Sequence, residues 1–248
     1  MSNQQKITAM RQGGKKLAQV KAQLRAFTKV GTTFEEIEAE AQVLIAAAGA
    51  KPNFSLVPGY HWATCIMKND EVCHGIPKNK LVESGDVITI DVGLLYQGYH
   101  LDTSFTFAVG KISTEVSAFL ATGQKSLEKA IDKVKPGATI YDVSRAMQKV
   151  VERQGYGAVY QLTGHGIGEE LHQDPAIPCV AQKSDKRQVL KPGQTVAIEI
   201  MYSMGDPELE LDDDGWTYRT ADRSLTGMFE ETVLVTDQGY QILTKSDN

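Results

Sequence analysis

The distribution of apolar and polar positions predicts helices in some stretches of the chain and strands in others. Residues 15–49 are expected to form two helices around the segment GTTFEEIEAEAQ (31–42). Thr33 is the expected N-cap of the second helix, with Glu36 at the capping-box position and Gly49 at its end. Runs rich in Val, Ile, Thr and Phe and bounded by glycine, such as GDVITID (85–91), predict strands. This mixture predicts an α+β protein.

The predicted pair of helices occurs twice in the sequence. Residues 121–155 repeat it around the segment PGATIYDVSRAMQ (136–148). Four positions correspond at an offset of 106 residues: Gly31, Thr33, Ile37 and Gly49 match Gly137, Thr139, Val143 and Gly155. Internal similarity of this kind indicates two related structural units.

Each helical pair is followed by a His-Gly-Ile triplet, which begins at His74 in one half and at His165 in the other. A glycine-led apolar strand ending in an acid comes next, GDVITID (85–91) and then GQTVAIE (193–199), at an offset of 108 residues. Another acid precedes a further strand in each half: Asp102 before TSFTFAVG and Glu230 before ETVLVTDQG. Two similar halves are expected to pack about a pseudo-twofold axis, which would bring matching acids together.

Asp91 and Asp102 flank a predicted hairpin whose turn is YQGY (96–99). With Gln97-Gly98 as a two-residue loop, Asp91 pairs with Ser104, two residues beyond Asp102. Side chains alternate between sheet faces, so both carboxylates should point to the same side as diagonal neighbours. That side should be the core, because the VITID strand is apolar.

Several carboxylates that converge in a core repel one another and are costly to bury. The repeat adds Glu199 and Glu230 to Asp91 and Asp102, and it also adds the imidazole of His165. Two divalent cations would supply a compensating charge of +4. One histidine with four carboxylates suits Mn, Fe, Co or Zn better than Ca or Mg alone. The sequence therefore predicts a dinuclear metal site.

Composition narrows the class of protein. The 248 residues carry a net charge of -5, which does not favour DNA as a partner. The odd set of cysteines has no CxxC pair, which argues against a disulfide framework and a structural zinc site and fits a reducing compartment: Cys65, Cys73 and Cys179. No secretory signal or membrane-spanning run is visible, so we expect a cytoplasmic protein that does not bind membranes.

From about residue 5 to 244 the chain resembles the type I methionine aminopeptidases. Seven motifs together carry the resemblance: VCHGIP (72–77), IDVG (90–93), HLDTSF (100–105), GHGIGEELH (164–172), AIEI (197–200), DGWTYRTADRSL (214–225) and FEETVLVTDQG (229–239). It implies the pita-bread (creatinase/aminopeptidase) fold, in which two pseudo-twofold-related halves share a central antiparallel sheet covered by helices. We expect a single catalytic domain over residues 1–248, with halves at about 5–112 and 113–244.

The resemblance implies that two divalent ions are held by the residues that the repeat singles out: Asp91, Asp102, His165, Glu199 and Glu230. The implied activity is removal of the N-terminal methionine from nascent proteins and peptides by metal-activated hydrolysis of the first peptide bond. Glu199 is the candidate proton shuttle. His172 would stabilise the oxyanion or orient the carbonyl, and His74 would hydrogen-bond the substrate backbone. Four further residues match positions that line the methionine pocket: Tyr60, Cys65, Leu171 and Trp216.

Two positions depart from the family pattern. Ile200 stands where a proline usually follows the glutamate ligand, which is expected to loosen a turn there. Phe54 occupies a pocket position that is often cysteine. His61 and Cys73 are expected to have no catalytic role, whereas His100 could lie behind Asp102 or on a strand surface. The acidic segment 205–215 is expected to be a solvated loop, with substrate steering as the lesser alternative.

Two other functions remain open from the sequence. One is an Xaa-Pro aminopeptidase or prolidase, which would use the same ligands on the same fold. The other is a catalytically inactive pita-bread protein that serves as a binding module. The internal pseudo-symmetry favours a monomer, and the class would allow ribosome association, although no basic extension marks it.

Overall fold

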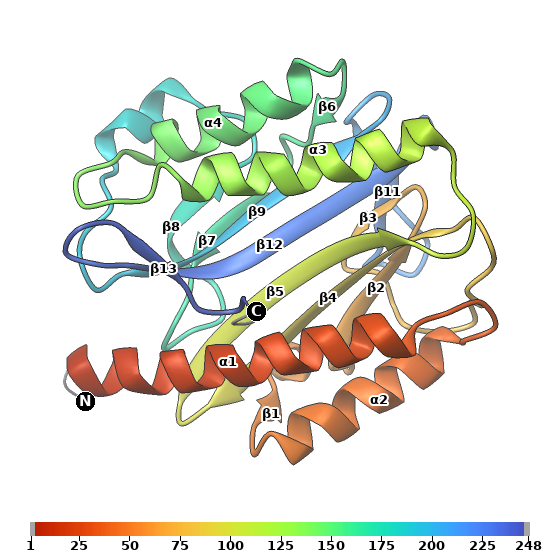
Figure 1. The fold of residues 1–248 in the computed structure, drawn as a ribbon, viewed down its shortest axis with the longest axis horizontal. Helices are drawn as coiled ribbons and strands as arrows, with labels where there is room; N and C mark the ends of the chain where they lie inside the picture. The colour runs from red at the N-terminus through yellow and green to blue at the C-terminus, as the bar shows by residue number, and fades with distance from the viewer. Residues whose placement is uncertain (1–2, 246–248) are drawn as a thin grey trace.

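Each half of the chain begins with a pair of helices (Figure 1). The computed structural model describes residues 3–245. The helices are α1 (Asn3–Phe27) and α2 (Phe34–Ala47) in the first half, and α3 (Thr114–Ile131) and α4 (Ile140–Glu152) in the second. Thr33 caps α2 in a capping box with Glu36, as expected, and Thr139 caps α4 in the same way with Asp142.

The strands of the first half are β1 (Lys51–Pro52), β2 (Thr64–Lys68), β3 (Glu71–Cys73), β4 (Val87–Tyr96) and β5 (Tyr99–Ala108). Those of the second half are β6 (Gly157–Ala158), β7 (Thr163–Gly166), β8 (Gln173–Pro178), β9 (Thr195–Ser203), β10 (Leu209–Leu211), β11 (Tyr218–Thr220), β12 (Thr226–Val235) and β13 (Tyr240–Ile242). Short 3-10 helices lie at Phe54–Leu56 (η1) and Lys183–Arg187 (η2).

The β4–β5 hairpin has the register that the sequence predicts. Gln97 and Gly98 both have positive φ, at 51° and 86°, as a two-residue hairpin turn requires. Gly93 pairs with Asp102, and Asp91 pairs with Ser104. The two carboxylates therefore lie on one face of the sheet.

The second half repeats the sheet of the first. β4 pairs with β5 along one edge, and with β2 and β1 along the other. In the same way, β9 pairs with β12 along one edge, and with β7 and β6 along the other. All of these pairings are antiparallel. The N-cap threonines extend the repeat, because Thr33 bridges to Leu81 and Thr139 bridges to Val189.

The two halves meet along β5 and β12, which run side by side in Figure 1. Threonine hydroxyls join these strands. Thr232 Oγ1 accepts from Asp102 N at 3.0 Å and lies 2.8 Å from Asp102 O, and Thr103 Oγ1 donates to Glu230 O at 2.8 Å. This threonine seam fixes the position of one half's carboxylates relative to those of the other.

The helices lie over one face of the strands, as Figure 1 shows for α1 and α3. Because side chains alternate between the two faces of a strand, neighbours of the residues that contact the helices face away from the helices. Thr103 and Glu231 both reach Lys21 of α1, at 2.9 and 2.7 Å. Their neighbours Asp102 and Glu230 consequently point to the opposite face.

Two boundaries differ from the sequence-based expectation. α1 begins at Asn3 rather than near residue 15 and continues through Gly13 and Gly14. A Cβ at Gly14 would lie 2.3 Å from Leu243 O, so the glycines allow close packing rather than ending the helix. The acids also lie inside β4, β5, β9 and β12 rather than at the strand ends.

The position of Ile200 is a further correction. The expected turn after Glu199 is wrong, because β9 continues through Ile200, which is fully buried and pairs with Phe229. Segment 205–215 is not simply a solvated loop either, since it contains β10 paired with β11. Among residues 3–245 no helix has both the length and the apolarity needed to cross a bilayer.

Candidate metal centre and substrate pocket

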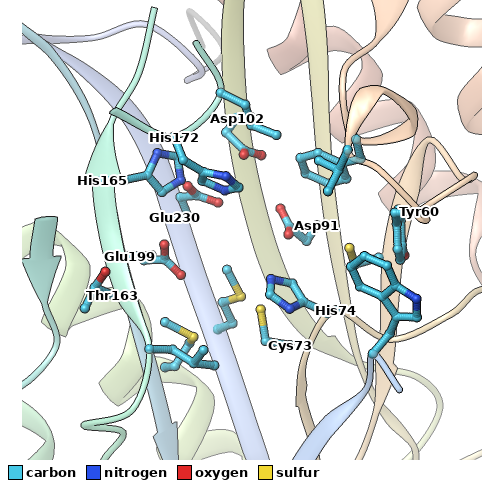
Figure 2. A pocket seen from close by; sticks show the side chains of 18 of the residues that line it. Tyr60, Cys73, His74, Asp91, Asp102, Thr163, His165, His172, Glu199 and Glu230 are labelled. Carbon is cyan, nitrogen blue, oxygen red and sulfur yellow. The ribbon is translucent and has the colours of Figure 1, made fainter. Parts of the chain in front are cut away.

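A cavity of about 300 Å³ lies on the face of the central strands that the helices leave open. Figure 2 shows side chains from both halves pointing into it, with Tyr60 on one side and Thr163 and Glu199 on the other. The cavity is lined by Phe54, Val57, Tyr60, Cys65, Cys73, His74, Asp91, Asp102, Gln161, Leu162, Thr163, His165, Leu171, His172, Glu199, Met201, Trp216, Met228 and Glu230. All of the candidate site residues predicted from the sequence are among them.

Four carboxylates enter the cavity, one from each of the four longest strands. Asp91 comes from β4 and Asp102 from β5, while Glu199 and Glu230 face each other directly across β9 and β12. Each of these residues is 5% exposed or less. The duplicated hairpins thus place two acids from each half in one buried space.

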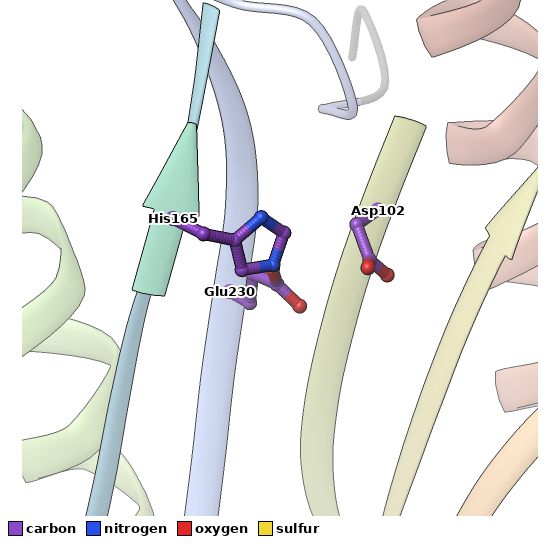
Figure 3. A group of neighbouring side chains, drawn as sticks. All are labelled: Asp102, His165 and Glu230. Atoms are coloured by element: carbon purple, nitrogen blue, oxygen red, sulfur yellow. The ribbon is translucent and has the colours of Figure 1, made fainter. Parts of the chain in front are cut away.

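His165 completes a cluster that could hold a metal ion. One ligand atom from each of Asp102, His165 and Glu230 lies within 4.8 Å of the others (Figure 3). His165 Nδ1 is 3.0 Å from Gly166 O, a contact that places the proton on Nδ1 and leaves the Nε2 lone pair available. A backbone carbonyl that holds one ring nitrogen in this way is typical of a histidine whose other ring nitrogen ligates a metal.

The carboxylates are electrostatically unfavourable as bare anions. Burial raises the pKa of Asp91 well above its usual range, and the nearby Asp102 and Glu199 raise it further. Burial also raises the pKa of Asp102, to about 7, and the pKa values of Glu199 and Glu230 rise for the same reason. Asp91 Oδ1 is buried without a hydrogen-bond partner. Divalent cations would supply both the missing charge and the missing partner, so these residues fit a metal centre.

The cavity histidines are neutral near pH 7. Burial and the nearby His172 lower the pKa of His165 to about 4, and they also lower the pKa of His74. Burial lowers the pKa of His172 as well. The rings of His165 and His172 lie 4.5 Å apart edge to face. Each neutral imidazole keeps one N–H donor and one lone pair.

Aromatic and sulfur-containing side chains form the other wall of the cavity. Tyr60 packs edge to face on Trp216 with ring centroids 5.1 Å apart, and its hydroxyl donates to Thr64 O at 2.8 Å. Cys65 is buried beside it, paired with Asp91 across β2 and β4. Phe54 reaches the cavity from η1, and Leu171 from the loop after β7. This wall is largely apolar.

Several residues that line the cavity were not expected from the sequence: Val57, Gln161, Leu162, Thr163, Met201 and Met228. For two of them a signal was present. Met201 lies two residues after Glu199, and Met228 lies two residues before Glu230, so strand periodicity puts them on the ligand face. Cys73, expected to be merely packed, is buried but also lines the cavity. Its pKa is raised by burial and by Glu199, which opposes a nucleophilic thiolate.

The two remaining histidines do not line the cavity. His61 is exposed, with its ring 6.0 Å from that of Trp62. His100 is partly buried in β5, and its backbone N donates to Gly168 O at 2.7 Å. Its Nδ1 is buried without a partner.

Sequence comparison assigns the family. Residues 8–237 match the model of metallopeptidase family M24. The chain belongs to this family. It is similar to methionine aminopeptidase 1 of Bacillus subtilis, at 35% identity with 95% of each chain covered. It is also similar to the methionine aminopeptidase of Escherichia coli K12, at 37% identity with 96% of this chain and 90% of the relative covered.

Solved structures support the same assignment. The methionine aminopeptidase of Thermotoga maritima matches with a TM-score of 0.94 and 37% identity over 98% of this M24 chain and 97% of its own. A prolidase from Pyrococcus furiosus matches with a TM-score of 0.79 over 98% of this chain and 65% of its own, but at 24% identity it shows the fold alone. The predicted resemblance and the pita-bread fold are therefore confirmed.

Proposed function

We propose that this M24 metallopeptidase removes the N-terminal methionine from proteins and peptides at the cavity between its two halves. The observation that carries the proposal is the convergence of four buried carboxylates and His165 from five strands. The curated relatives named methionine aminopeptidase cover nearly the whole chain. Together they favour a metal-dependent aminopeptidase over a binding module, because a scaffold protein would have no need of this electrostatically costly cluster.

Two divalent ions would be held by Asp91, Asp102, His165, Glu199 and Glu230. Such ions, when bound, acidify a water molecule and polarise the scissile carbonyl. Mn, Fe, Co and Zn all suit this mixture of carboxylates and imidazole. The closeness of Asp102 of the first half to His165 and Glu230 of the second supports a centre whose ligands come from both halves.

Glu199 is our candidate for the proton shuttle. Its carboxylate lies in the cavity on the second half's side (Figure 2), where it would take a proton from the attacking water and pass it to the leaving amine. The lowered pKa values of His74 and His172 keep both rings neutral. His172 would donate its N–H to the developing oxyanion, and His74 would hydrogen-bond the substrate backbone.

The methionine side chain would occupy the wall formed by Tyr60, Cys65, Leu171 and Trp216, with Phe54 beside them. A thioether packs well against aromatic rings and tolerates an irregular apolar surface. The free α-amino group of the substrate would face the carboxylates and the ions they hold, which restricts cleavage to chain ends. Phe54 adds bulk where the family often has cysteine, so it would narrow this pocket.

A comparison of two peptides tests the proposal. Purified protein supplied with Mn²⁺ should release methionine from Met-Ala-Ser and should leave an Xaa-Pro peptide such as Ala-Pro-Ser intact. Turnover of the proline peptide alone would assign the chain to the prolidase-like branch of the fold. Absence of turnover of both peptides by metal-loaded protein would instead favour the binding-module alternative.

A further inference from the structure

The two halves differ most in the connection between their central strands. β4 and β5 are joined by the two residues Gln97 and Gly98, whereas β9 and β12 are joined by residues 204–225. This longer connection contains β10 and β11, which we call the wall hairpin (Leu209–Thr220). It carries Trp216 into the cavity wall. The symmetry of the duplicated fold is thus broken at the substrate pocket.

The wall hairpin is fastened to the first half through β11. Arg219 Nη2 lies 3.2 Å from Glu71 Oε1 of β3 and 2.6 Å from Asp212 Oδ2 of the hairpin itself. Asp214 Oδ1 accepts from the backbone N of both Trp216 and Thr217, at 2.8 Å each. These contacts fix the turn that carries the Trp216 ring toward Tyr60.

On the other side, one side chain of the second half holds β10. Gln161 Nε2 donates to Leu209 O at 3.2 Å, and Leu209 N donates to Gln161 Oε1 at 3.0 Å. The Gln161 amide thereby satisfies both the backbone N–H and the backbone C=O of Leu209, as a paired strand would. Gln161 also lines the cavity and lies two residues before Thr163. A single side chain therefore contacts both the cavity and the wall hairpin.

We propose that Gln161 is a positioning residue for substrate specificity, whose amide clamp on Leu209 sets where the wall hairpin and Trp216 stand against the methionine side chain. The inference rests on the proposed function for its substrate, but the clamp itself can be tested without turnover. Loss of the clamp should weaken substrate binding more than the chemical step, because the carboxylates and histidines stay in place.

The test compares Gln161→Met, which keeps the length of the side chain but removes both bonds, with Gln161→Glu, which keeps only the acceptor for Leu209 N. Gln154→Met is the matched control, because Gln154 is exposed and does not line the cavity. In Mn²⁺-loaded Gln161→Met, KM for Met-Ala-Ser should rise about three- to tenfold while kcat changes less than about twofold. Gln161→Glu should fall between Gln161→Met and the unaltered protein.

Two readouts do not depend on activity. Hydrogen exchange at the Leu209 amide should accelerate about tenfold in Gln161→Met. Trp216 fluorescence, measured in a Trp62→Phe background because the chain has two tryptophans, should become easier to quench with acrylamide. Unchanged exchange and quenching in Gln161→Met would overturn the clamp, as would a loss of kcat at constant KM. Absence of turnover by the unaltered protein would count against the proposed function and leave these two readouts decisive for the clamp.

Discussion

Asp91 is the residue whose environment is hardest to explain without a cation. Its carboxyl is buried, it lies beside Asp102 and Glu199, and its Oδ1 lacks a hydrogen-bond partner. On a solvent-exposed face of the sheet, two carboxylates placed diagonally like Asp91 and Asp102 would cost little. Inside the cavity, Asp91 demands an ion or a proton.

Replacing Asp91 with asparagine should therefore remove metal and activity together. The neutral amide keeps the shape but loses the charge, so kcat/KM for Met-Ala-Ser should fall by about a hundredfold or more. Metal content measured by mass spectrometry should fall as well. Asp213→Asn, at an exposed position of the β10–β11 turn, is the matched control and should behave as the unaltered protein does. Full metal content with normal turnover in Asp91→Asn would refute the ligand assignment.

Replacing His74, unlike replacing Asp91, should reduce activity without loss of the bound metal. His74 follows β3 with a positive φ of 57°, and its ring lies in the cavity beside the acids (Figure 2). His74→Asn should retain metal while kcat falls by about a hundredfold, because a hydrogen bond to the substrate backbone is lost in the transition state. His61→Asn, at an exposed site, provides the control. Normal kcat in His74→Asn would remove its proposed role.

The buried carboxyls also predict how the metal-free protein responds to pH. Their folded pKa values are raised, to about 7 for Asp102, so the folded state binds more protons than the unfolded state above pH 4. Stability contributed by these protons is lost as pH rises through the folded pKa. The histidines act in the opposite sense around pH 6.5, because their lowered folded pKa values leave only the unfolded state able to bind these protons, and this contribution fades above about pH 7.5.

Above about pH 7.5, unfolding of chelator-treated protein should therefore become easier as pH rises, by up to about 1.4 kcal/mol per pH unit for each carboxyl proton still bound in the folded state. Thermal melts at several pH values check this. Asp102→Asn should show a shallower dependence, since one titrating carboxyl is absent. A metal-free protein that became more stable over this range would contradict the assigned direction of the shifts.

The threonine seam between β5 and β12 is the element on which the alignment of the two halves depends. Thr232 satisfies both the N and the O of Asp102, and all of these groups are buried. Because the seam lies next to two of the carboxylates, its geometry controls both the fold and the site. A single hydroxyl thus connects sheet stability to metal binding.

Thr232→Val keeps the volume of the side chain but leaves the backbone groups of Asp102 without partners. The free energy of unfolding should fall by about 1–3 kcal/mol, because buried polar groups are then unsatisfied. Affinity for Mn²⁺, measured by calorimetry, should weaken as Asp102 shifts. Thr122→Val, at a partly exposed position of α3, is the control for the substitution. Unchanged stability and affinity would show that packing alone holds the seam.

Element boundaries show how far sequence reasoning reaches. The capping box of Thr33 and the register of the β4–β5 hairpin follow from local chemistry, and both were predictable. The early start of α1 was not, because Gly13 and Gly14 reflect close packing against β4, β5 and the Leu243 backbone rather than a helix end. The extension of β9 beyond Glu199 depends on pairing with β12, which is equally non-local.

For the whole molecule, the internal repeat was the most informative feature of the sequence. It singled out the four acids and His165 that the structure gathers in one cavity, because duplicated halves put equivalent positions near one axis. It could not reveal the wall hairpin, since the first half joins its corresponding strands, β4 and β5, by only two residues. Ion pairs such as Arg219 with Asp212 also changed the interpretation of segment 205–215, whose charges are partly paired.

Anomalous diffraction from crystals grown with Mn²⁺ examines the proposed metal centre most directly. We expect two manganese peaks in the cavity, each coordinated by carboxylates and one of them also by His165. Manganese peaks elsewhere, or an ion-free cavity at saturating Mn²⁺ with the carboxylates still gathered, would contradict a dinuclear centre in this protein.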